Sequence, residues 1–140
     1  MTRHALIERQ ATFGACDGLV LALGLVVSLT GQPHALVKAA IAAGLAELVG
    51  MAAGCYLSDS AGGIWAALAN GGAAFVACAI PAVPYALASG LAALIPSLLL
   101  VCAVAGVISW LRPEKGVLAI VQTYGVLFAA ALLCWAASLL

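Results

Sequence analysis

Two carboxylates, Asp17 and Glu47, lie within long apolar stretches of a sequence that holds only five acidic residues. A charged Asp at the centre of a membrane span costs about 2.5–3.5 kcal/mol, so such residues usually face a bundle interior or a polar cavity. A carboxylate in that position can bind a cation or a proton. Both groups could instead be protonated or bonded to the backbone as packing groups, although a neutral side chain would do that at lower cost.

Glu47 also begins a series of potential metal ligands. Met51 and Cys55 follow it at intervals of four residues, which places the three side chains on one face of a helix. A carboxylate, a thioether and a thiol offer one hard donor and two softer ones, a set that favours Fe²⁺, Zn²⁺ or Cu⁺ over Mg²⁺ or Ca²⁺. A methionine on an apolar helix is otherwise most often core filler.

These residues need a scaffold, and the composition indicates one embedded in lipid. The chain is 66% hydrophobic and 7% charged, whereas a soluble domain is about 25% charged. A helix needs roughly 20 apolar residues to cross the hydrocarbon core of a bilayer. Five stretches qualify, at residues 13–30, 35–57, 64–87, 91–111 and 116–138, and we expect the helix of the first to extend over about residues 3–30. We expect an all-α membrane protein whose residues 1–140 form a single transmembrane domain.

Short loops between these stretches predict that consecutive helices are antiparallel neighbours. Pro81 and Pro84, late in the third stretch, and Pro96, early in the fourth, each predict a kink, because proline removes a backbone hydrogen bond. A bend that serves only packing is the plainer interpretation of these prolines.

Basic residues predict the orientation. A cytosolic N-terminus leaves only Lys38 on the outer side, in line with the excess of basic residues found in cytosolic loops. The residues on the cytosolic side are then Arg3, Arg9, Arg112 and Lys115. At 1.5 Å per residue, Glu47 lies roughly 16 Å from the cytosolic helix end, about mid-membrane. Asp17 reaches a similar depth if the first helix starts near Thr2.

One chain supplies too few ligands for a six-coordinate cation. A two-fold dimer would repeat Asp17, Glu47 and Met51 around its axis, since an isologous interface uses each residue twice. Gly50 and Gly54 form a GxxxG pattern, and small residues at this spacing let helices approach closely. We therefore expect a homodimer.

Three segments resemble the vacuolar iron transporter family. Residues 13–20 read FGACDGLV, close to the first-helix signature FGANDGLV of that family. Residues 44–58 read GLAELVGMAAGCYLS and resemble its second-helix block, in which an acid precedes a methionine by one turn and a G-E-Y-[VL]-S run follows. Residues 80–85 read IPAVPY and resemble the third-helix I-P-x-x-P-Y.

The resemblance implies a five-helix homodimer that exports Fe²⁺ or Mn²⁺ from the cytosol in exchange for protons, through a pathway between the protomers. Zn²⁺ and Co²⁺ are further candidate ions. Asp17, Glu47 and Met51 match pore positions of the family and would coordinate the metal. Because a carboxylate binds either a proton or a cation, metal affinity would fall with falling pH. A prokaryotic inner membrane is the expected location.

The sequence departs from the family pattern in three places. Cys16 replaces the usual Asn, and Cys55 replaces the usual Glu of the G-E-Y run, which makes Cys55 a fourth candidate metal ligand. A link at residues 58–63, with Asp59 as its one acid, replaces the acidic metal-gathering insert that family members often carry.

These departures leave two other functions open: a non-transporting membrane subunit that keeps the fold for assembly, and a transporter of another solute. The sequence shows no nucleophile–base pair, phosphate-binding loop or cofactor motif, so we expect neither an enzyme nor a cofactor. A net charge of zero gives no indication of a nucleic-acid partner. The expected partners are membrane lipid, the divalent metal ion, protons and a second copy of the chain.

Overall fold

The computed structural model describes residues 2–58, 63–112 and 116–137, and within these ranges it contains helices and no strand. Five helical stretches in these ranges are long and apolar enough to cross a membrane. The predicted all-α class with five potential spans is therefore confirmed, and the fold is compatible with an integral membrane protein. Asp59 of the predicted link, residues 113–115 of the loop before the last helix and residue 138 lie outside the described residues.

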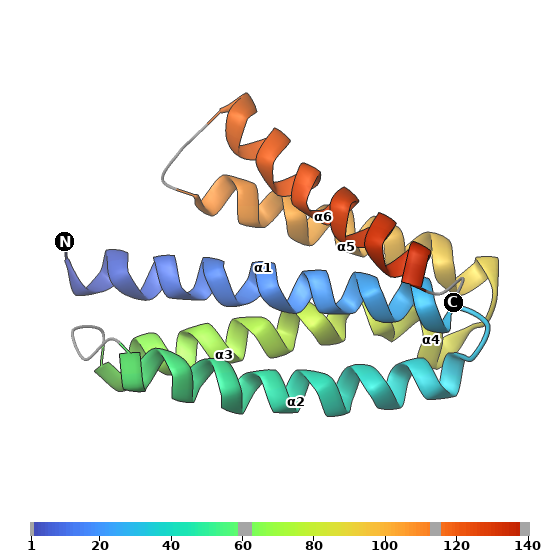
Figure 1. Ribbon diagram of the computed structural model, residues 1–140, viewed down its shortest axis with the longest axis horizontal. Coiled ribbons are helices and arrows are strands. Elements are labelled where there is room, and N and C mark those ends of the chain that lie inside the picture. Colours follow the sequence, from blue (N-terminus) through green and yellow to red (C-terminus); the bar gives the residue numbers. More distant parts are fainter. Residues whose placement is uncertain (1, 59–62, 113–115, 138–140) are drawn as a thin grey trace.

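The chain forms seven helical segments in the order α1, α2, α3, η1, α4, α5 and α6 within the described residues. Their bounds are Arg3–Leu29 (α1), Pro33–Ser58 (α2), Gly63–Ala79 (α3), Ile80–Ala82 (η1, a 3₁₀ turn), Val83–Leu87 (α4), Leu91–Leu111 (α5) and Val117–Ala137 (α6). The segments α3, η1 and α4 together make up the third potential span. α1 begins and α6 ends at opposite ends of the long axis (Figure 1).

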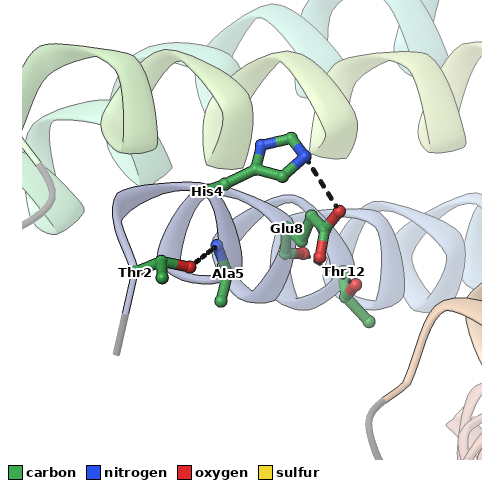
Figure 2. Close-up of polar contacts among 5 residues, drawn as sticks. All are labelled: Thr2, His4, Ala5, Glu8 and Thr12. Atoms are coloured by element: carbon green, nitrogen blue, oxygen red, sulfur yellow. Dashed lines mark hydrogen bonds and ion pairs between the residues drawn. The ribbon is translucent and has the colours of Figure 1, made fainter.

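α1 starts one residue after Thr2, well before the apolar stretch. The Thr2 hydroxyl accepts a hydrogen bond from the backbone N–H of Ala5 at 3.4 Å, which caps the first turn (Figure 2). His4 and Glu8 lie one turn apart on the exposed side, with their closest nitrogen and oxygen atoms 3.4 Å apart. The early start places Asp17 near the middle of α1 rather than near its beginning.

Three glycines bring α3 into close contact with both α1 and α2. A Cβ at Gly14 would overlap the backbone oxygen of Asn70, and one at Gly18 would overlap that of Ala74. On the other side of α3, a Cβ at Gly71 would overlap a backbone oxygen of α2. α1 and α2 consequently pack more extensively on α3, which lies between them in Figure 1, than on each other. The consecutive helices α2 and α3 are therefore close neighbours, as the short loops predict, whereas the consecutive helices α1 and α2 are held apart by α3.

The third span breaks at its prolines. α3 ends at Ala79, and Pro81 and Pro84 fall in the 3₁₀ turn and the short α4 that follow. The hydroxyl of Ser97 on α5 donates a hydrogen bond to the Pro81 carbonyl at 2.6 Å, in a fully buried position. α5 continues as a helix through Pro96.

α1 forms the centre of the bundle, with apolar clusters on both sides. One cluster joins Val26 to Leu36, Cys78 and Tyr85, and so connects α1 with α2, α3 and α4. A second cluster joins α1 to α5 and α6 through residues that include Leu23, Val101, Ile108 and Leu127. The helix that carries Asp17 is thus held from two directions (Figure 1).

Candidate functional site

Asp17 lies on the open face of α1, near the middle of the helix. Gly14 and Gly18 are buried against α3, whereas Asp17 and Phe13 are exposed on another side of α1. Arg9, Phe13 and Asp17 follow one another at intervals of four residues and therefore lie along one line. In the isolated chain, a carboxylate faces outward from the middle of a potential membrane span.

Glu47 occupies the corresponding position near the middle of α2. Its side chain is half-buried, and its Oε2 is enclosed with no hydrogen-bond partner among the described residues. The Asp17 carboxylate lies close enough to interact electrostatically with that of Glu47. The structure therefore brings the two predicted carboxylates near each other.

Cys78 on α3 belongs to the same neighbourhood. Its thiol is fully buried, donates to the Ala40 carbonyl at 3.6 Å, and is within electrostatic range of Glu47. The sequence analysis does not single out this cysteine, because nothing in the pattern of α3 relates it to residue 47. Only the packing of α2 on α3, where Gly44 lies against Phe75 and Cys78, brings the two together.

Met51 and Cys55 line a groove that Asp17 and Glu47 do not line. The groove has a volume of about 510 Å³ and is lined by Arg9, Gln10, Phe13, Gly50, Met51, Gly54, Cys55, Ser58 and Asn70. Met51 is half-buried, and Cys55 is 7% exposed and also packs against Ala66 and Ala67 of α3. The four candidate ligands thus form two pairs: two carboxylates at mid-bundle and two sulfur atoms nearer the first residues of α1.

Three residues of this groove were missed as functional residues by sequence reasoning. The Asn70 amide donates to the Gln10 side-chain oxygen at 3.3 Å across the α1–α3 contact. Arg9, which served only as an orientation marker, brings a positive charge to the same groove. In the sequence, the four-residue spacing of Arg9, Phe13 and Asp17 is the one signal that could have indicated that Arg9 lies near the candidate site.

The described part of one chain does not gather a cluster of acidic, cysteine and histidine side chains around a metal site. Among residues 2–58, 63–112 and 116–137, no group of three or more His, Cys, Asp and Glu side chains is placed to hold a metal ion. Gly50 and Gly54, on the exposed side of α2, have nothing within 4 Å of the position that a Cβ would occupy. This part of α2 leaves room for another helix.

Comparison of the chain with protein-family models, with curated proteins and with solved structures finds no match.

Proposed function

We propose that this protein is a membrane transporter that exports Fe²⁺ or Mn²⁺ from the cytosol in exchange for protons, through a pathway between two copies of the chain. The observation that carries the proposal is the outward-facing Asp17, near the middle of α1, within electrostatic range of the enclosed carboxyl group of Glu47. In the proposed orientation the first residues of α1 lie in the cytosol.

The free-energy cost of exposing an acidic side chain to lipid supports the presence of a second copy of the chain beside Asp17. A charged Asp at the centre of a span costs about 2.5–3.5 kcal/mol, and this cost falls where the residue faces a polar cavity or a partner. A two-fold axis beside Asp17 would gather two carboxylates from each protomer. Four like charges at low dielectric require compensation, and a divalent cation or protons can supply it in alternation.

The groove next to this site supports a route for the ion. Met51 and Cys55 present sulfur donors between the cytosolic helix ends and the carboxylates, and such donors suit Fe²⁺ and Zn²⁺ better than Mg²⁺. The resemblance of residues 13–20 and 44–58 to the vacuolar iron transporter family adds to this reading. Under the proposal, protonation of Asp17 and Glu47 on an acidic far side releases the metal there.

A second candidate function is a non-transporting membrane subunit. Two observations favour it: Arg9 places a positive charge in the groove through which a cation would pass, and Cys55 packs with Ala66 and Ala67 like an ordinary core residue. In such a subunit, the exposed surface of α2 would serve assembly alone.

Flux measurements separate the two candidates. The purified chain in liposomes with an acidic lumen is given Fe²⁺, Mn²⁺, Zn²⁺ or Co²⁺ outside, and metal uptake is recorded. We expect metal uptake by the wild type and the loss of uptake in Asp17→Asn. Glu8→Gln is the matched control, because it also removes an exposed acid, at the start of α1, and it should retain near-wild-type uptake. Unchanged flux in Asp17→Asn would remove the proposed site. No wild-type flux with any of the four ions would favour the assembly subunit.

A further inference from the structure

A second cleft lies between α1 and the α5–α6 pair, and Arg9 and Phe13 line both this cleft and the groove of Met51 and Cys55. The cleft has a volume of about 1100 Å³ and is formed by the first half of α1, the end of α5 and the first half of α6. Figure 1 shows that α6 diverges from α1 toward its first residues. The volume of the cleft is slightly above the range for small-molecule pockets, about 300–1000 Å³.

Two guanidinium groups give this cleft its charge. Arg9 and Arg112 both line it, together with one acid, Glu8. The Arg112 side chain reaches toward α6, where its Nη1 donates to the Thr123 hydroxyl at 3.5 Å, and it lies within electrostatic range of Cys16. The Glu8 carboxylate points toward His4 along α1 (Figure 2).

The walls of the cleft are apolar and open. Phe13, Val126 and Trp110 line it and are 62%, 53% and 73% exposed. A ligand that fills the cleft must therefore combine an anionic group, which meets the guanidinium groups, with an apolar part that covers Phe13 and Val126. A small soluble anion would leave these walls uncovered.

We propose that this cleft binds an anionic phospholipid, with its phosphate at Arg9 and Arg112 and an acyl chain along Phe13 and Val126. The planar fork of a guanidinium group matches the geometry of phosphate oxygens. Basic pockets between membrane helices are a recurrent site for anionic headgroups. Trp110, at the end of α5, is the type of residue that lies at the level of lipid headgroups. The proposal depends on a membrane location but not on metal transport.

The test uses the full chain in detergent micelles that contain equal amounts of dioleoyl phosphatidylglycerol and dioleoyl phosphatidylcholine. Native mass spectrometry records the ratio of the two lipids retained by the protein. We expect the wild type to retain the anionic lipid preferentially. Arg112→Gln should lower this preference about fivefold, the effect of one basic residue at a membrane surface. Lys38→Gln removes a positive charge from the exposed start of α2 and should leave the preference unchanged.

Two further variants keep the test decisive if Arg112→Gln fails to fold. Arg9→Gln should also lower the preference, and Val126→Trp should reduce retention of the lipid without a change of charge, because it fills the apolar part of the cleft. Equal retention of both lipids by the wild type, or equal effects of Lys38→Gln and Arg9→Gln, would overturn the proposal. Displacement of the lipid by inorganic phosphate would overturn the proposal in favour of a free anion. Loss of lipid only when two copies associate would overturn it in favour of a second copy.

Discussion

Gly14 on α1 lies so close to the backbone carbonyl of Asn70 on α3 that a Cβ at residue 14 would overlap the carbonyl oxygen. Gly18 repeats this contact against Ala74 one turn later. The two glycines fix the side of α1 that faces α3. Asp17 lies between them in the sequence, so the same contact determines the direction in which its side chain leaves the helix.

Gly14→Ala should therefore lower the stability of the bundle. The added methyl group meets a backbone oxygen that cannot rotate away, and the two helices must separate, at a cost of about 1–3 kcal/mol. Thermal unfolding of the purified protein in detergent measures the effect. Gly125→Ala on α6, where a Cβ meets nothing within 4 Å, serves as the control and should be neutral or slightly stabilising. Equal melting temperatures for Gly14→Ala and the wild type would contradict this account.

The hydroxyl of Ser97 stabilises the break in the third span. It donates to the Pro81 carbonyl at 2.6 Å where both residues are buried. Ser97→Ala leaves that carbonyl without its donor, and we expect a loss of about 1–2 kcal/mol in the free energy of unfolding. Ser109→Ala is the matched control, because the Ser109 hydroxyl donates back to the Ala105 carbonyl of its own helix at 2.9 Å. The prediction fails if both variants unfold at the same temperature.

The sequence was sufficient to predict five apolar helices with Asp17 and Glu47 near the middle of the first two, because both follow from residue type and spacing along single helices. It did not predict that Met51 and Cys55 line a groove apart from Glu47. A step of four residues turns an α-helix by about 400°, so the line of side chains drifts by about 40° at each step.

The position of α3 between α1 and α2 could also not be predicted from the sequence. It depends on the backbone contacts at Gly14, Gly18 and Gly71. In a sequence, a glycine that contacts a neighbouring backbone cannot be distinguished from a glycine that does not. Gly72, directly beside Gly71, has no atom within 4 Å of the position that a Cβ would occupy. Only the relative placement of the helices distinguishes such residues.

Acidification should weaken metal binding if Asp17 and Glu47 exchange protons for the cation. The ligand form of a carboxylate is deprotonated, so each proton released on binding lowers the apparent affinity by up to about tenfold per unit decrease in pH. Mn²⁺ binding to the purified protein at two pH values one unit apart gives this slope. Glu47→Gln keeps the size of the side chain and should reduce the slope, since one proton-binding group is lost.

Glu8→Gln provides the control for that measurement, because it removes an exposed acid that lies outside the proposed site and should retain the wild-type slope. A wild-type affinity that is the same at both pH values would exclude proton exchange at these carboxylates. A slope unaffected by Glu47→Gln would assign the exchange to other groups.

Gly50 and Gly54 provide the sharpest test of the proposed dimer. Neither has an atom within 4 Å of the position that a Cβ would occupy, so the first side-chain atom of Gly50→Leu or Gly54→Leu meets no other part of the same chain, although both residues line the groove of Met51 and Cys55. If a second copy packs on this part of α2, the leucine side chains hold the two helices apart and the dimer dissociates. Light scattering after gel filtration in detergent measures the mass, and Gly125→Leu, equally unobstructed on α6, should leave the dimer intact. A monomeric wild type, or dimers that persist in both α2 variants, would mean that Asp17 is not covered through this face.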